Sequence, residues 1–151
     1  MTLKADIEGF LAQKKLALAG ASRGRRKFGN NIFKELKNKG YQVFLIHPSA
    51  ELIDGQPCYR DCGSLPDEVG GLIIAVRPAQ TEKAVESAAR AGIKRIWMQR
   101  GAESPKAIRL CRANGITVIH NECVLMFAEP AALIHRVHRL IWKLIGKLPA
   151  S

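Results

Sequence analysis

The chain has 151 residues, of which 47% are hydrophobic and 25% charged, which is typical of one globular domain and excludes a disordered chain. Its formal net charge of +11 indicates a polyanionic partner: a nucleotide, a nucleic acid or an acidic membrane surface. No apolar run approaches the roughly 18 residues of a spanning helix, and the N-terminus lacks a signal-peptide pattern. We therefore expect a cytoplasmic protein without a transmembrane segment.

Short apolar runs alternate with amphipathic helical segments along the chain. Such continuous runs are typical of strands buried on both faces of a parallel sheet, and Pro78 and Ser104-Pro105 mark helix starts between them. The runs cover residues 16–19, 43–46, 72–76, 95–98 and 116–119. The pattern predicts an α/β fold: a doubly wound, Rossmann-like parallel sheet of about five strands, in a single domain over 1–151 with its core at about 14–123.

Two segments depart from this alternation. Residues 49–70 are rich in glycine and proline, which predicts a loop with at most one short strand near Cys58-Tyr59. Residues 130–148 predict an amphipathic C-terminal helix with a basic face. We interpret this helix as packed over the sheet; a homodimer contact is the second interpretation, and membrane-surface attachment through Trp142 is the third.

The first predicted strand ends in a glycine turn that opens a candidate phosphate site. Gly20 allows a tight turn, and the loop runs to Asn30 before a helix that reaches about Lys39. Ligands of open parallel sheets bind at the carboxyl ends of the strands, where N–H groups at a helix start can hold a phosphate. The hydroxyl of Ser22 adds a hydrogen-bond donor.

This loop departs from the dinucleotide fingerprint in two ways. Ser22 and Arg25 stand where its second and third glycines would fall. After the second strand, His47-Pro48 stands where an acid would hold a ribose diol. Both departures disfavour NAD.

Positive charge is concentrated in the same loop, in Arg23, Arg25, Arg26 and Lys27. A guanidinium can grip a phosphate through two parallel donors. The cluster therefore favours a ligand with an additional ribose phosphate, which NADP and coenzyme A both carry. The alternative interpretation is a solvated surface loop without a ligand. The basic residues follow a strand and a glycine turn, and this position favours a ligand-binding loop.

Together with several later segments, this loop resembles the CoA-binding domain family, whose fold is similar to the N-terminal domain of the succinyl-CoA synthetase alpha subunit. The resemblance runs in order from about residue 14 to residue 123. The similar segments are Gly20-Ala21-Ser22-Arg23, Lys27-Phe28-Gly29, Gly40-Tyr41-Gln42-Val43, His47-Pro48, Gly55, Cys58-Tyr59, Val76-Arg77-Pro78, Trp97-Met98-Gln99, Gly101 and Asn121-Glu122-Cys123.

The resemblance implies that coenzyme A, or an acyl-CoA, is the cofactor and that the first loop takes its phosphates. Asn121-Glu122 replaces the Asp-Arg that is more usual before the cysteine. The residues expected to bind the cofactor are Gly20, Ala21, Ser22, Arg23, Lys27, Phe28, Gly29, Asn30, Pro48, Val76, Arg77, Pro78, Gln99 and Cys123.

No catalytic or metal site is expected. The cysteines are too few and too irregularly spaced for a disulfide framework or a zinc site, and no histidine belongs to a recognisable triad. Cys123 is interpreted either as a partner for the pantetheine thiol or as an inert side chain, and Cys111 as core packing.

The leading hypothesis is therefore a non-catalytic coenzyme A-binding protein. The alternatives are an NADP-dependent oxidoreductase or an accessory subunit of an acyl-CoA synthetase. A nucleic-acid binder is suggested by charge alone, and with 6% aromatic residues and no recognition motif no specific nucleic-acid partner is expected.

Overall fold

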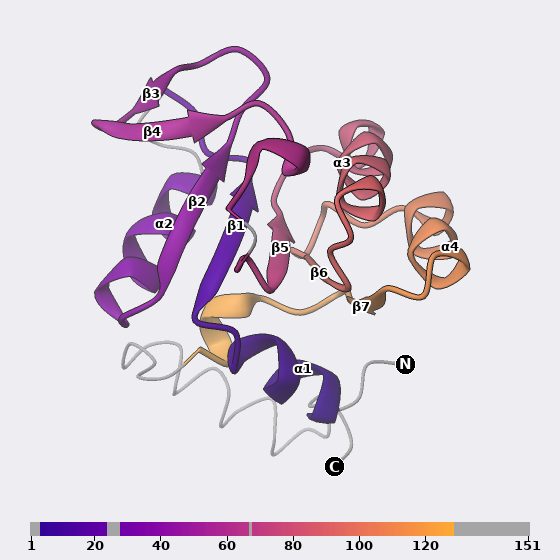
Figure 1. Ribbon diagram of the computed structural model, residues 1–151. Coiled ribbons are helices and arrows are strands. Elements are labelled where there is room, and N and C mark those ends of the chain that lie inside the picture. The colour runs from indigo at the N-terminus through magenta and orange to yellow at the C-terminus, as the bar shows by residue number, and fades with distance from the viewer. Residues whose placement is uncertain (1–3, 24–27, 67, 129–151) are drawn as a thin grey trace.

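The computed structural model describes residues 4–23, 28–66 and 68–128, and seven strands form its sheet in the order β3-β4-β2-β1-β5-β6-β7 (Figure 1). Neighbouring strands are parallel except for β3 and β4, which are antiparallel. The strands are β1 (Lys15–Ala19), β2 (Gln42–Ile46), β3 (Leu52–Ile53), β4 (Gln56–Tyr59), β5 (Gly71–Ile74), β6 (Arg95–Met98) and β7 (Thr117–Ile119).

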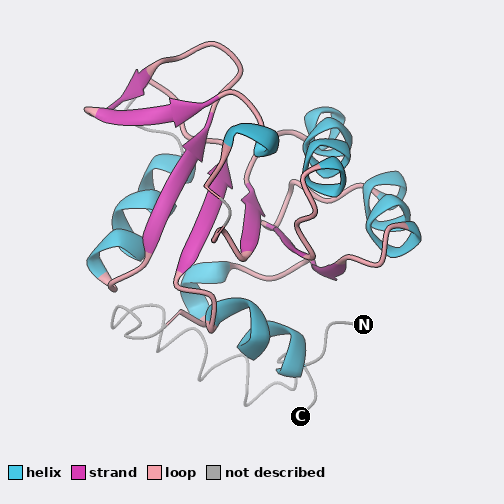
Figure 2. Ribbon diagram, viewed as in Figure 1, coloured by secondary structure: helices cyan, strands magenta, loops and turns pink. Residues whose placement is uncertain are grey.

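Helices cover both faces of this sheet (Figure 2). Two apolar cores result, one containing residues of α1, α2 and η2 and the other residues of α3 and α4. The helices are α1 (Lys4–Leu11), α2 (Phe28–Asn38), α3 (Pro78–Arg90) and α4 (Pro105–Ala113), with short 3-10 turns η1 (Cys62–Ser64) and η2 (Val124–Met126). The predicted doubly wound α/β fold is confirmed.

The central strand β1 explains why the strands read as continuous apolar runs. Leu16 and Leu18 point into the core with α1 and α2, whereas Ala17 and Ala19 point into the core with α3 and α4. Successive side chains of a strand face opposite sides of the sheet, so a strand covered on both faces needs apolar residues at every position.

Helices α3 and α4 begin where the sequence predicted helix starts. Ser104 precedes α4, and its hydroxyl accepts a hydrogen bond from the N–H of Ala107 at 3.0 Å, with Pro105 in the first turn. Pro78 occupies the same place in α3 after Arg77. The Ser104 cap satisfies an N–H group that has no partner within α4, whereas α3 has no side-chain cap and begins with a proline that lacks an N–H.

The prediction for residues 49–70 is wrong in one respect, because this segment contains two strands. β3 and β4 form a hairpin around Asp54 and Gly55, whose φ angles are +49° and +77°. Positive φ at both central residues is typical of a type I′ turn, for which Asp-Gly is a preferred pair. The sheet therefore has seven strands rather than about five.

Helix α1 was also not predicted, and it closes one core. Its Phe10 packs edge-on against Trp97 of β6, with ring centroids 5.4 Å apart. The predicted helix over 130–148 lies outside the described residues. Within the part of the chain that the structure describes, no helix is long and apolar enough to cross a membrane.

Candidate functional site

The candidate site lies at the carboxyl end of β1, where the strand order reverses. The chain passes from β1 to β2 on one side, and β5 lies on the other side of β1. Gly20 follows β1 with a φ of +133°, and a Cβ there would lie 2.6 Å from the carbonyl oxygen of Ala75, just after β5. Only glycine permits this approach, which brings the turns after β1 and β5 together.

The start of α2 packs directly on the same turn. A Cβ added to the buried Gly29 would lie 2.5 Å from the carbonyl carbon and oxygen of Gly20. Close helix–strand packing is the role of the third glycine in the dinucleotide fingerprint. Here Gly29 fills that role from a longer loop, so the fingerprint spacing did not reveal it.

Asn30 fixes the shape of the loop. Its carboxamide oxygen accepts a hydrogen bond from the backbone N–H of Ser22 at 2.9 Å, and its Nδ2 donates to the Ser22 carbonyl at 2.7 Å. One side chain thus holds both backbone groups of a residue eight positions earlier. Asn30 shapes the predicted phosphate loop, a role that its type and position alone did not indicate.

The charge around the loop is positive. Arg23 and Arg77 are exposed, and neither α2 nor α3 carries an acid in its first turn. Helix N-termini carry partial positive charge, so two helix starts and two arginines make this edge suited to an anion. Lys27 lies outside the described residues.

The turn after β2 is organised by His47. Its Nδ1 accepts hydrogen bonds from the N–H groups of Ala50 at 2.8 Å and Ser49 at 3.1 Å. His47 is therefore held by its own turn, and the neighbouring Pro48 is exposed.

The β3–β4 hairpin approaches the same loop from the side. Asp54 at its tip lies 3.5 Å from Nδ2 of Asn30. The Asp-Gly pair of this turn is typical of a hairpin and is visible in the sequence. That the hairpin lies beside Asn30 depends on the tertiary structure and could not be predicted.

Cys58 of β4 is also near the loop. Burial raises the pKa of its thiol, while the positive charge of Arg23 opposes that shift. Arg23 therefore lies close enough to β4 for its charge to act on the Cys58 thiol. The resemblance included Cys58, but it was not predicted as a site residue.

Gln99 and Cys123 meet at the ends of β6 and β7. Gln99 is 2% exposed; its side-chain oxygen accepts from the N–H of Val124 at 2.8 Å, and its Nε2 lies 3.5 Å from the sulfur of Cys123. Gln99 thus fastens the segment that carries Cys123. The two predicted residues are in contact, but the side-chain amide of Gln99 is used in contacts with Val124 and Cys123 of the protein itself.

Glu122 is the buried acid of this corner. Among the described residues its Oε2 has no hydrogen-bond partner. Burial raises the pKa of the carboxyl group, and the charge of Arg100 acts in the opposite direction. The Glu122 carbonyl accepts from the indole N–H of Trp97 at 2.9 Å, which ties the segment to the core.

The structure therefore brings part of the predicted set together. Residues 20–23, the start of α2 and the turn before α3 meet at the switch point. Val76 is half-buried against the core that contains α3, so only part of it faces outward. Within the described residues, no group of three or more His, Cys, Asp or Glu side chains is placed to hold a metal ion.

A parallel sheet with helices on both faces, and a glycine turn at its switch point, defines a Rossmann-like α/β domain. Residues 14–129 match the family described as CoA binding domain, and the chain belongs to that family. The resemblance seen in the sequence is thereby confirmed.

Solved structures support the same fold. A conserved hypothetical protein from Pyrococcus furiosus is 35% identical, with a TM-score of 0.70 over 73% of this chain and 95% of its own. A hypothetical protein from Pyrococcus horikoshii OT3 is 30% identical, with a TM-score of 0.74 over 80% of this chain and 85% of its own.

Curated relatives are much longer. ADP-forming acetate–CoA ligase I of Archaeoglobus fulgidus is 27% identical over 137 residues, which are 84% of this chain and 20% of the ligase. The alpha subunit of ADP-forming acetate–CoA ligase II of Pyrococcus furiosus is 22% identical over 78% of this chain and 28% of that subunit. The chain thus spans less than a third of either relative.

Proposed function

We propose that this chain binds coenzyme A, free or acylated, at the carboxyl edge of β1 and β5, without catalysing a reaction itself. The observation that carries the proposal is the family match over residues 14–129, together with the position of the Gly20–Arg23 turn at the switch point of the sheet. Pro48, Arg77 and Pro78 would line the nucleotide.

The phosphates would lie against the turn after β1, next to the N–H groups at the start of α2. N–H groups of a helix start and guanidinium groups both favour anions, and Lys27 would add charge. The Asn30 bonds to Ser22 would fix the loop before the ligand arrives, which lowers the ordering cost of binding. Phe28 is 51% exposed at the mouth of this loop and would offer an apolar face to the adenine or ribose.

The type of cofactor follows from charge and from the turn after β2. An NAD site would place an acid there to hold the ribose diol, but the chain has His47-Pro48, with the His47 ring bonded to its own turn. A ribose phosphate would instead be attracted by Arg23 and Lys27. This reasoning favours coenzyme A over NAD.

The curated relatives favour a more specific form of the proposed function. The two ligases named above are ADP-forming acetate–CoA ligases, and this chain spans 20% and 28% of their lengths. The chain would then be the cofactor-binding part of an acyl-CoA ligase. In that case Cys123 would lie near the pantetheine thiol.

Calorimetric titration of the whole chain with coenzyme A, dephospho-coenzyme A, NADP and NAD at physiological salt tests the proposal. Saturable binding that is tightest for coenzyme A, and weaker without the 3′-phosphate, is the expected result. Tighter binding of NADP, or no binding of coenzyme A, would overturn it.

A further inference from the structure

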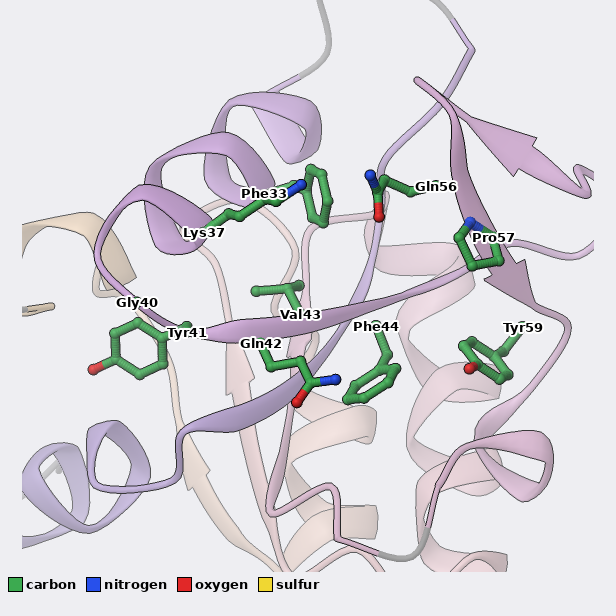
Figure 3. Close-up of a pocket in the computed structure, with 10 residues that line it drawn as sticks. All are labelled: Phe33, Lys37, Gly40, Tyr41, Gln42, Val43, Phe44, Gln56, Pro57 and Tyr59. Carbon is green, nitrogen blue, oxygen red and sulfur yellow. The ribbon is translucent and has the colours of Figure 1, made fainter.

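An open groove lies along the outer edge of β2, away from the carboxyl edge of the sheet. It encloses about 370 Å³. Figure 3 shows β2 crossing it edge-on, with Val43 directed toward α2 and Gln42 and Phe44 on the other side of the strand. Its lining residues are Phe33, Lys37, Gly40, Tyr41, Gln42, Val43, Phe44, Gln56, Pro57 and Tyr59.

The edge of β2 is open at this groove because β4 pairs with only part of it. The register joins Leu45 to Cys58 and Ile46 to Tyr59 and goes no further toward the start of β2. The N–H of His47 donates to the Tyr59 carbonyl at 2.8 Å. The next β4 residue that could donate on this side, two positions before Tyr59, is Pro57, which has no N–H.

Val43 is the β2 residue left beside the gap. Alternate residues of a strand direct their backbone groups to opposite neighbours. The N–H of Gln42 donates to Lys14, on the β1 side, so the backbone groups of Val43 point outward as those of His47 do. Among the described residues, no strand pairs with Val43 on that side. An N–H and a carbonyl exposed on a strand edge are complementary to another extended backbone.

The walls of the groove define the side chains that it would accept. Phe44 and Tyr59 form an edge-on aromatic pair with ring centroids 5.9 Å apart. The ammonium of Lys37 lies 5.7 Å from the ring centroid of Phe33, and that of Lys14 lies 4.6 Å from that of Tyr41. Among the described residues that line the groove, none is an acid and Lys37 is the charged one, so their net charge is positive.

We propose that this groove docks an extended, acidic segment of a partner polypeptide, which adds a strand to the outer edge of β2. Backbone hydrogen bonds to Val43 would hold the segment, as in other cases of strand addition. Apolar side chains would contact Phe33 and Phe44, and a carboxylate would meet Lys37. The segment would occupy the amino-terminal half of β2, so it could bind while the opposite edge holds a nucleotide.

The test is a selection of random twelve-residue peptides, displayed on phage, against the whole chain. Selected peptides are then synthesised, and their dissociation constants are measured for wild type, Lys37→Glu and Lys34→Glu. Lys34 is an exposed lysine of the same helix that does not line the groove, and circular dichroism checks that both variants fold. Amide hydrogen exchange of residues 42–44 is measured with and without peptide.

We expect selected peptides rich in Asp or Glu that slow exchange at the Val43 amide. Lys37→Glu should weaken their binding by about fivefold or more, because attraction becomes repulsion, and Lys34→Glu by less than about twofold. Saturating coenzyme A should leave peptide binding unchanged. No enriched peptide, binding in helical form, or binding that ignores Lys37 and leaves Val43 exchange unchanged would each overturn the proposal.

Discussion

The carboxamide of Asn30 holds both the N–H and the carbonyl of Ser22, at 2.9 and 2.7 Å. The start of α2 is therefore fastened to the turn after β1 by one side chain. Any phosphate bound to this turn would meet a backbone whose shape is already set.

Replacing Asn30 with alanine should lower both stability and affinity for coenzyme A. Two hydrogen bonds to partly buried backbone groups are lost, so we expect the free energy of unfolding to fall by about 1–3 kcal/mol. Urea unfolding and calorimetry measure the two effects. Asn114→Ala removes a single exposed contact to the Leu110 carbonyl in α4 and should leave the affinity unchanged; an equal loss of affinity in both variants would contradict this role.

Gly29→Ala tests the close packing of α2 on the turn. Its Cβ would meet the Gly20 backbone at 2.5 Å, and backbone atoms cannot move away as a flexible side chain can. We expect a loss of about 1–3 kcal/mol in the free energy of unfolding. The matched change Gly9→Ala in α1, where a Cβ meets no atom of the described residues within 4 Å, should raise stability by up to about 1 kcal/mol. Similar effects at both positions would show that Gly29 is not a packing glycine.

Glu122 should make stability depend on pH in the acidic range. Its folded pKa is raised above the ordinary value of 4.5 by burial, so the folded protein binds the proton more tightly than the unfolded chain does. Within the window between those two pKa values, this group makes the protein less stable as the pH rises and more stable as it falls.

Glu122→Gln should therefore stabilise the protein at pH 7 by about 1 kcal/mol, and the gain should vanish at pH values below 4.5. Urea unfolding across the pH range measures this difference. Glu86→Gln, at an exposed position of α3, is the control and should change little. A Glu122→Gln protein that is less stable than wild type at pH 7 would contradict the interpretation.

The cysteines should react unequally with iodoacetamide at pH 8. Burial raises the pKa of the Cys111 thiol to about 11, and Cys111 is fully buried, so it should stay unmodified in the folded protein. Cys58 is half-buried beside Arg23 and should react faster. Acetyl-CoA, whose sulfur is acylated and cannot consume the iodoacetamide, should slow the labelling of Cys58 if the phosphates lie at the loop, whereas NAD should not. Peptide mass spectrometry follows both sites, and faster labelling of Cys111 would contradict its burial.

The parallel sheet could be predicted because strands buried on both faces appear in the sequence as continuous apolar runs, such as Leu16–Ala19. Helix starts at Pro78 and Ser104 were equally readable, because proline and an N-cap hydroxyl act locally. The hairpin was harder, since β3 and β4 are too short to give a hydrophobic period, although Asp54-Gly55 marked its turn. Helix α1 buries only Ile7 and Phe10, which is too weak a pattern to predict a helix.

The candidate site could be located from the sequence, but the roles within it could not. Gly20 was identified from its place after a strand, whereas Gly29 was not recognised as a packing glycine because the loop is longer than the fingerprint allows. Gln99 stands at a strand end as expected, yet its amide bonds to Val124 and Cys123. Which atom a side chain meets depends on contacts between segments far apart in the chain.

The most direct measurement is the affinity of coenzyme A for wild type, Arg23→Ala and Arg109→Ala by calorimetry. Arg109 is an exposed arginine of α4, so its removal lowers the net charge equally without touching the loop. We expect saturable binding that weakens about fivefold in Arg23→Ala, corresponding to roughly 1 kcal/mol, and is unchanged in Arg109→Ala. Equal affinities for all three proteins, or no binding by wild type, would contradict a coenzyme A site at the turn after β1.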